Sequence, residues 1–412
     1  MKYKQGDNKK MILFGGGKIG RSFIGQLFSC SGYEVVFVDI NQGLIDELNR
    51  RGKYSVVIKG NDTISNISVE NVRGIHLSNR EQIIEEVTTA SILAISVGMA
   101  NVEKLAPLIS QSLNRRFNKN PNSPIDIIIG ENMRHGAKFL HEKLSENLPS
   151  DFPLSSYVGM VETSIGKMVP IMTKKEETED LLQVFAEPYN NLIVDRRGFK
   201  NSLPKVDGLD PKEKIEAWVD RKLFIHNLGH ATAAYIGYIY NPDFKYIYEV
   251  LAEPQLKALI KKTMHEAADI LLKMYPDTFT STSLTDHIDD LVSRFENRHL
   301  KDTIYRVGQD LLRKLGSEDR FVGAIKMGHS LNMPTKNILL ALVAGMFFRA
   351  TDEQGQLFSK DMNFISDFDK GIYHILTNVC VFDPDKHDDI FNIAEEYFAE
   401  FKKSPKNILN YL

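Results

Sequence analysis

Between residues 11 and 130, short runs of aliphatic and β-branched residues alternate with stretches in which apolar residues recur at helical spacing. The runs predict strands and the stretches predict amphipathic helices, because side chains alternate between faces in a strand and return to one face about every 3.6 residues in a helix. The expected strands are residues 11–14, 34–38, 54–58, 91–97 and 125–129. The expected helices are residues 19–31, 43–51, 80–87 and 102–118. This order predicts a parallel-rich sheet covered on both faces, an α/β fold of Rossmann type.

The pattern changes after residue 211. Further extended segments are expected at 157–161, 167–172 and 191–194, and a loop rich in Gly, Asn and Pro follows at 198–211. Beyond it, apolar residues keep helical spacing and prolines fall between helices, so the second part is expected to be predominantly α-helical. We therefore predict a dinucleotide-binding Rossmann-type domain over residues 1–205 and a helical substrate and catalytic domain over residues 206–412.

Composition excludes several classes of protein. The net charge of −3 provides no strong field for nucleic acid or an anionic membrane, so an anionic substrate must meet local cations. The apolar run 338–348 is shorter than the roughly 20 residues that cross a bilayer. The two cysteines, Cys30 and Cys380, are far apart and form no disulfide framework. We expect a cytoplasmic protein with a small-molecule substrate, no nucleic-acid partner and no membrane attachment.

A glycine-rich segment follows the first expected strand. Gly15, Gly17 and Gly20 form the pattern G-x-G-x-x-G at the start of a helix, and Asp39 ends the second expected strand. In dinucleotide-binding domains these glycines permit a tight turn, approach of the pyrophosphate and close packing, and an acid about 20 residues on accepts hydrogen bonds from ribose. The segment predicts a dinucleotide site; a glycine-rich turn in another α/β protein is the alternative.

The acid also discriminates between cofactors. Asp39 would repel the 2′-phosphate of NADP, and the following Ile40 and Asn41 provide no cation, so we expect NAD. Ser96 and Val97, after the fourth strand, are expected beside the cofactor, although a plain strand-to-helix turn explains them equally well. The residues expected to bind the cofactor are Gly15, Gly17, Lys18, Ile19, Gly20, Asp39, Ser96 and Val97.

The segment 222–230, Lys-Leu-Phe-Ile-His-Asn-Leu-Gly-His, places polar residues in a hydrophobic helical stretch. At about 100° per residue, Lys222, Asn227 and His230 fall within an arc of roughly 140° on an ideal α-helix. A lysine acts as a general base when its pKa falls from about 10.4 toward roughly 7 to 8, which burial among apolar neighbours can cause. Asn227 and His230 would then donate hydrogen bonds to a substrate oxygen.

Each of these residues taken alone has a structural explanation, as a solvated lysine, a helix cap or a satisfied core histidine. Their joint position after a dinucleotide domain favours catalysis. His226 lies on the same face and is expected to pack rather than react. The sequence contains no Cys/His cluster with the spacing of a zinc site, so we expect no metal.

The pattern K-x-x-x-x-N-x-x-H formed by Lys222, Asn227 and His230 resembles the signature of the polyol-specific long-chain dehydrogenases, and the resemblance covers nearly the whole chain. The opening segment 14–25, FGGGKIGRSFIG, and the blocks at 131–133, 222–231 and 294–297 are most similar to the mannitol-1-phosphate 5-dehydrogenases of that family. The resemblance implies metal-independent hydride transfer in which Lys222 takes the hydroxyl proton. It also implies that Asn132 and Asn227 bracket the oxygen and that His230 binds and orients the reacting hydroxyl.

The resemblance therefore predicts an NAD-dependent enzyme that interconverts D-mannitol 1-phosphate and D-fructose 6-phosphate. The alternatives are a reductase of a hexuronate, tagaturonate or fructuronate, and a mannitol 2-dehydrogenase. An alternative of another class is a non-catalytic NAD-binding sensor. Because the family includes monomers, we expect a monomer.

One segment departs from the family pattern. Where many relatives carry an Asp-Arg pair, this chain has Gly166 and Lys167. Glu162 could replace the missing acid, and the loss of an acid near the substrate would suit a phosphorylated one. The candidate cations for the phosphate are Lys167, Arg294, Arg306 and Arg349, each of which could equally be a solvated surface charge. Arg294 is the first choice because it lies in a family block.

Overall fold

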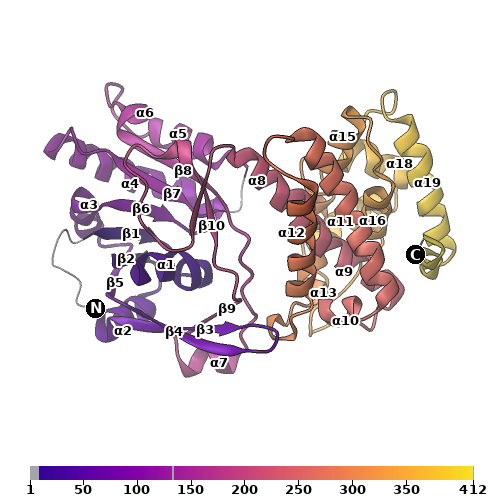
Figure 1. Ribbon diagram of the computed structural model, residues 1–412, viewed down its shortest axis with the longest axis horizontal. Helices are drawn as coiled ribbons and strands as arrows, with labels where there is room; N and C mark the ends of the chain where they lie inside the picture. Colours follow the sequence, from indigo (N-terminus) through magenta and orange to yellow (C-terminus); the bar gives the residue numbers. More distant parts are fainter. Residues whose placement is uncertain (1–8, 132–133, 412) are drawn as a thin grey trace. The chain divides into compact units, whose positions relative to one another are not determined.

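The computed structural model describes residues 9–131 and 134–411. The chain divides into two compact units, Met1–Val219 and Asp220–Leu412, which we call the N-terminal and C-terminal units (Figure 1). The expected boundary at residues 205 and 206 lies inside the N-terminal unit by this division. The reason is β11 (Leu209–Lys212), which pairs in parallel with β10 (Leu192–Asp195) and so belongs to the sheet of that unit.

The N-terminal unit contains an eight-stranded sheet in the order β11-β10-β8-β7-β6-β1-β2-β5 and a three-stranded sheet in the order β4-β3-β9. Six neighbouring strands of the large sheet run parallel, in the spatial order β8-β7-β6-β1-β2-β5. Next to them, β10 pairs antiparallel with β8. The remaining strands are β1 (Lys10–Phe14), β2 (Glu34–Asp39), β3 (Lys53–Lys59), β4 (Ile64–Glu70), β5 (Val72–His76), β6 (Ile92–Ile95), β7 (Ile125–Ile129), β8 (Val158–Ser164) and β9 (Val184–Ala186).

The two faces of the parallel sheet are both buried. Met11 and Leu13 of β1 belong to one hydrophobic cluster, and Ile12 and Phe14 belong to the other, as period-two alternation requires. Helices cover both faces (Figure 1), and those of the unit are η1 (Gly20–Gly25), α1 (Gln26–Cys30), α2 (Gln42–Arg51), α3 (Arg80–Thr89), α4 (Met99–Lys119), α5 (Gly136–Ser145), α6 (Leu154–Tyr157) and α7 (Lys174–Glu179). The predicted α/β Rossmann-type fold is therefore confirmed.

Three expected segments differ from the structure. Residues 54–58 form a strand, β3, but it lies in the small sheet, and the third strand of the large sheet is β5. The hydrophobic pattern did not predict β5 because this strand contains Arg73, Gly74 and His76. Glycine is needed at position 74, because a Cβ there would lie 2.7 Å from Cδ1 of Ile45. Residues 167–172 have no regular secondary structure, and the expected loop 198–211 includes the first residues of β11.

The C-terminal unit is helical, as predicted. The helices α9 (Leu228–Tyr240) and α16 (Lys336–Met346) are almost wholly buried, whereas α11 (Pro254–Met274), α12 (Ser281–Phe295) and α19 (Asp388–Lys403) bury one face (Figure 1). A Cβ at Gly229 would lie 2.6 Å from Sδ of Met264, so glycine permits the close approach of α9 and α11.

The other helices from residue 215 onward are α8 (Ile215–Arg221), η3 (Lys222–Asn227), α10 (Ile247–Leu251), η4 (Arg298–Leu300), α13 (Ile304–Gly308), α14 (Leu311–Lys314), α15 (Val322–Ser330), α17 (Asp361–Phe368), α18 (Ile372–His374), η5 (Ile375–Val379) and η6 (Pro405–Tyr411). Within the described residues, none of the helices combines the length and the apolar character that a membrane crossing requires.

Candidate functional site

The glycine-rich turn has the backbone conformation that its sequence predicts. Gly15 has φ +101°, and a Cβ there would lie 2.1 Å from the carbonyl oxygen of Ser96. A Cβ at Gly20 would lie 2.2 Å from the carbonyl oxygen of Gly15, whereas a Cβ at Gly17 would meet no atom within 4 Å. The first and third glycines therefore permit close packing, and the second leaves the backbone open to a ligand. These residues fit a pyrophosphate at the start of the following helix.

Asp39 ends β2 with its carboxylate directed at the same turn. Its Oδ2 accepts a hydrogen bond from the backbone N–H of Gly16 at 2.7 Å, and its Oδ1 accepts one from Asn41 at 2.9 Å. Each carboxylate oxygen retains a further lone pair for a ribose hydroxyl. The next side chain, Ile40, is 74% exposed and carries no charge for a 2′-phosphate.

Arg21, which the sequence analysis did not select, holds the glycine-rich turn in place. Its Nε donates to the carbonyl oxygen of Gly16 at 2.7 Å, and its Nη1 donates to the carbonyl oxygens of Leu181 and Leu182 at 2.9 and 2.7 Å. Burial lowers the pKa of this guanidinium. Its donors are used by the backbone, so Arg21 acts as a support for the turn.

The other expected cofactor residues surround the turn. Lys18 forms an ion pair with Glu177 at 2.9 Å, and Ile19 packs against the core. The N–H of Ser96 bonds to Phe14, the last residue of β1. Val97 donates its N–H to Oε1 of Glu131 at 2.7 Å.

Glu131 shapes the loop after β6 and was not selected as a site residue. It is 7% exposed and also accepts the N–H of Gly98 at 2.8 Å, and burial raises its pKa. The sequence signal was its place in the family block 131–133. Asn132, expected to contact the substrate oxygen, lies outside the described residues.

Two of the tentative substrate residues have local partners. Glu162 accepts the N–H of His135 at 3.0 Å, at the start of α5, and burial raises its pKa. Lys167 is 6% exposed; its Nζ donates to Oδ1 of Asn190 at 2.8 Å and lies 5.0 Å from the ring centroid of Phe23. Both groups therefore already support the N-terminal unit.

The segment 222–230 of the C-terminal unit, in which catalytic residues are expected, is not an ideal α-helix. Residues Lys222–Asn227 form a π-helical turn, η3, which continues α8 and leads into α9. In a π-helix the N–H bonds to the carbonyl five residues earlier, so Lys222 and Asn227 are one turn apart on the same face. The expected arc of roughly 140° is therefore wrong for this segment. Single π-helical turns of this kind are frequent at functional sites.

Lys222 has the electrostatic property of a base. Burial, and then the charge of Arg320, lower its pKa from 10.5 to about 7. At neutral pH a large fraction of this amine is therefore unprotonated and can accept a proton. Arg320, missed from the sequence, donates from Nη1 to the carbonyl oxygen of Asn227 at 3.0 Å.

His230 lies in α9 between an aromatic ring and a carboxylate. Its imidazole stacks on Phe295, with ring centroids 4.6 Å apart and an interplanar angle of 8°, and its Nε2 is 3.2 Å from Oδ2 of Asp302. That pair lacks hydrogen-bond geometry. Asp302 favours the charged ring, but burial and the cations Arg306, Lys314, Arg320 and Arg294 outweigh it and hold the pKa of His230 well below its ordinary value. The ring is therefore neutral near pH 7.

His226 is buried beside the same ring. It is 6% exposed, and its ring centroid lies 5.6 Å from that of Phe295 and 6.3 Å from that of His230. Burial and then the charge of Arg294 lower its pKa well below the ordinary value. Arg294, on α12, pairs with Asp290 at 3.3 Å. The structure thus brings the predicted cation Arg294 into the electrostatic environment of His226 and His230.

Asp302 and Lys314 are further members of this environment that were not predicted from the sequence, whereas Arg306 was one of the candidate cations for the phosphate. Asp302 is buried and forms an ion pair with Arg306. Lys314 is buried, its Nζ donates to the carbonyl oxygen of Val307 at 2.6 Å, and burial followed by Arg320 lowers its pKa to about 7. No sequence spacing could reveal these contacts, because the residues come from segments far from the Lys222 helix.

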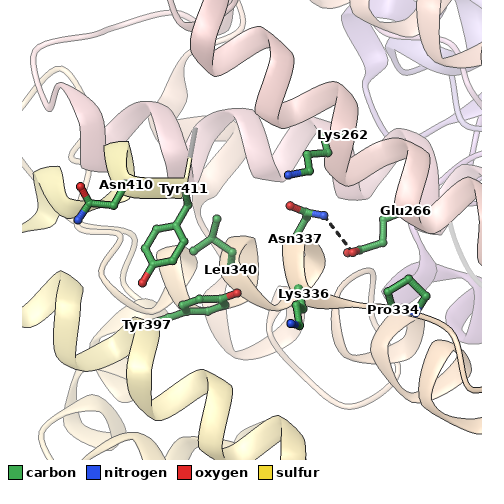
Figure 2. Close-up of a pocket in the computed structure, with 9 residues that line it drawn as sticks. All are labelled: Lys262, Glu266, Pro334, Lys336, Asn337, Leu340, Tyr397, Asn410 and Tyr411. Atoms are coloured by element: carbon green, nitrogen blue, oxygen red, sulfur yellow. Dashed lines mark hydrogen bonds between the residues drawn. The ribbon is translucent and has the colours of Figure 1, made fainter.

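A separate pocket of about 470 Å³ lies within the C-terminal unit (Figure 2). Its lining residues are Lys262, Glu266, Pro334, Lys336, Asn337, Leu340, Tyr397, Asn410 and Tyr411. None of the expected catalytic residues is among them. Oε1 of Glu266 accepts Nδ2 of Asn337 at 3.0 Å and Oε2 accepts the N–H of Ile338 at 2.9 Å, so this acid caps the start of α16.

The side chains of residues 9–131 and 134–411 form no set of metal ligands. Within these ranges, no group of three or more His, Cys, Asp or Glu side chains is arranged to hold a metal ion.

Two solved dehydrogenase structures resemble this chain. A D-sorbitol dehydrogenase in substrate-free form matches with a TM-score of 0.79 and 13% identity, over 96% of this chain and 93% of that chain. An octopine dehydrogenase with NADH and pyruvate matches with a TM-score of 0.49 and 10% identity, over 86% of this chain and 93% of that chain. At 13% identity, the likeness to the D-sorbitol dehydrogenase shows the fold alone.

Two family models match consecutive parts of the chain. The mannitol dehydrogenase Rossmann domain matches residues 9–208, and the mannitol dehydrogenase C-terminal domain matches residues 214–383. Together they cover most of both units, and they agree with the resemblance found in the sequence and with its implication of an NAD-dependent polyol dehydrogenase. The chain therefore belongs to the mannitol dehydrogenase family.

Proposed function

We propose that this NAD-dependent polyol dehydrogenase interconverts D-mannitol 1-phosphate and D-fructose 6-phosphate, with Lys222 as the general base. The observation that carries the proposal is a lysine with a pKa of about 7 on a π-helical turn that also bears Asn227. A base whose pKa lies close to the working pH is the most effective at that pH.

The residues of the C-terminal unit carry the proton step. In oxidation, neutral Lys222 accepts the proton of the substrate hydroxyl while the carbinol carbon loses a hydride; in reduction the protonated lysine returns the proton. Asn227, His230 and Asn132 donate hydrogen bonds to the reacting oxygen and stabilise its negative charge. A neutral imidazole at His230 suits this role, because it donates without competing for the proton that Lys222 takes.

The residues of the N-terminal unit carry the cofactor. NAD, when bound, supplies the acceptor or donor of the hydride. We assign the pyrophosphate to the turn formed by Gly15, Gly17 and Gly20, and the adenosine ribose to Asp39. Lys18, Ile19, Ser96 and Val97 complete this set as neighbours of the turn.

The charges around His230 favour a phosphorylated substrate. Arg294, Arg306, Lys314 and Arg320 all lower the pKa of His230, so their combined field reaches the proposed reaction centre. A phosphate monoester gains more from such a field than neutral mannitol does. Arg294 is the best supported of the predicted phosphate ligands, because its charge reaches His230. Lys167 is less well supported, because Asn190 already engages it. Glu162, an acid, would repel a phosphate and stays a prediction for the remainder of the substrate.

A substrate comparison tests the proposal. Oxidation of NADH should be fast with fructose 6-phosphate and slow with fructose and tagaturonate. Activity confined to fructose would favour a mannitol 2-dehydrogenase, and activity confined to tagaturonate or fructuronate would favour a hexuronate reductase. Tight binding of NADH without turnover of any of these sugars would favour a non-catalytic sensor.

A further inference from the structure

Arg320 connects the π-helical turn to a distant segment of the C-terminal unit. It is 8% exposed and precedes α15, and its Nη1 donates to the carbonyl oxygen of Asn227 across 93 positions of sequence. A helix that changes from π to α spacing displaces carbonyls from their regular partners, and an inserted donor stabilises such an irregular turn. The contact falls at the last residue of η3.

The guanidinium is itself oriented by a carboxylate. Oδ1 of Asp319 accepts Nε of Arg320 at 2.8 Å and the backbone N–H of Arg320 at 2.7 Å. The other oxygen of Asp319 accepts Nη1 of Arg313 at 3.1 Å. The planar fork of an arginine suits this arrangement, because one edge bonds to the carboxylate while another donor reaches the turn.

We propose that Arg320 is a positioning residue, whose guanidinium holds the π-helical turn that carries Lys222 and Asn227 and keeps a positive charge beside the lysine. The inference rests on the proposed function, in which Lys222 is the base. The charge disfavours protonation of the lysine, which is already disfavoured by burial. The other titratable groups in the surroundings of the turn include Asp220 and Arg221 on α8, His226 within η3, His230 on α9, His287 and Arg294 on α12, Arg306 on α13 and Lys314 on α14.

The pH dependence of polyol oxidation tests this role. Oxidation requires neutral Lys222, so kcat should rise with pH through an acidic limb near pH 7 in the wild-type enzyme. In Arg320→Gln the positive charge is lost and the pKa of Lys222 rises, so the limb should move up by about one pH unit. At pH 7 this shift lowers kcat about fivefold, with a smaller change in KM.

Two matched variants separate the charge from the contact. Arg320→Lys keeps the charge, but its compact ammonium cannot reproduce the fork, so the limb should stay near the wild-type pH while kcat falls by about threefold. Lys403→Gln removes a cation of α19 that pairs with Glu400 and whose side chain is 70% exposed, so it should keep the wild-type limb and kcat. Thermal unfolding and NADH titration establish that each variant is folded.

A folded Arg320→Gln enzyme with the wild-type limb would overturn the inference. If Arg320→Gln does not fold, the kcat of Arg320→Lys tests the inference instead. A wild-type kcat in Arg320→Lys would overturn the positioning role. The proposed function fails differently: the wild-type enzyme would then lack the acidic limb, or Lys222→Ala would retain turnover.

Discussion

Burial gives two lysines of the C-terminal unit pKa values of about 7, but they have different neighbours. Lys222 lies on a π-helical turn with Asn227, whereas Lys314 donates to the carbonyl oxygen of Val307. Only the first belongs to the set of groups that matches a proton acceptor with two donors. A low pKa alone therefore does not single out a base, and the neighbouring donors are the reason that we propose Lys222 and not Lys314.

Replacement of Lys222 by Ala should abolish most of the turnover. General base catalysis contributes about 10² to 10⁴ in rate, so kcat should fall by that factor, while the Kd of NADH stays within about twofold because the cofactor residues are in the other unit. Steady-state kinetics and fluorescence titration of NADH measure the two quantities. Lys262→Ala, an exposed lysine of the pocket in Figure 2, is the control. Unchanged kcat in Lys222→Ala would refute the assignment.

Lys314 should make stability depend on pH. Its pKa is about 7 in the folded protein and 10.5 as the ordinary value, so between these values the unfolded chain binds more protons. The free energy of unfolding therefore rises with pH over this window, with a slope approaching about 1.4 kcal/mol per pH unit from this group. Lys314→Met should lack this contribution.

Chemical denaturation at about pH 7.5, 8.5 and 9.5 measures the effect, because these values lie between the folded and the ordinary pKa of Lys314. The curve of unfolding free energy against pH should be flatter for Lys314→Met than for the wild type. Parallel curves would show that Lys314 is charged in the folded protein.

At the scale of the residue, the sequence could predict only the groups that lie close together along the chain. Lys222, Asn227 and His230 share one helical stretch, so spacing and a family pattern revealed them. Arg320 and Asp302 reach the same stretch only through the fold, and arginines and aspartates are common enough that no spacing selects these two. The roles of the predicted residues stay predictions until variants are measured.

At the scale of the element, α16 depends on a cap from another helix. Glu266 on α11 accepts hydrogen bonds from Asn337 and from the N–H of Ile338, and Figure 2 shows the first of them. Glu266→Ala leaves these buried donors without their acceptor and should cost about 1 to 3 kcal/mol of stability. Glu266→Gln retains an acceptor and should cost less.

Thermal unfolding of these variants tests the cap. Glu395→Ala, an exposed acid on α19, should change stability by less than about 0.5 kcal/mol and serves as the control. Equal stability of Glu266→Ala and wild type would mean that water replaces the carboxylate at α16.

Elements with strong periodicity were predictable, and irregular ones were not. The strand 125–129 and the helix from residue 80 match their expected positions closely, because hydrophobic alternation and helical spacing are local properties. The position of residues 54–58 in the small sheet depends on pairing with β4 and β9, which no local pattern specifies. The π-helical turn was equally hidden, since an ideal α-helix was the only geometry that the spacing could assume.

At the scale of the whole molecule, NADH should stabilise the protein against heat. A ligand that binds only the folded state at about 100 times its Kd adds about 2.7 kcal/mol. NADPH should give a much smaller shift in Tm, because Asp39 repels its 2′-phosphate. Asp39→Ser should weaken NADH binding by about tenfold, through the loss of charge-assisted hydrogen bonds to the ribose.

Differential scanning fluorimetry with each cofactor measures these shifts. Asp46→Asn serves as the control, because it removes the charge of an exposed acid on α2 whose Oδ1 accepts a hydrogen bond from Gln42. This variant should show the wild-type shifts in Tm with NADH and with NADPH. Equal responses to NADH and NADPH in the wild type would contradict the assignment of Asp39. The two-part organisation, an α/β unit followed by a helical unit, was predictable because each half has its own hydrophobic period.

The outer edge of the large sheet has a consequence for solubility. The edge strand β11 pairs through Pro211 with Val194 of β10, and a proline in an edge strand must direct its nitrogen, which carries no hydrogen, away from its neighbour. A further strand that approached this edge would find one donor missing from the ladder. Pro211 thus makes β11 a poorer template for strand addition, which disfavours edge-to-edge aggregation at this strand.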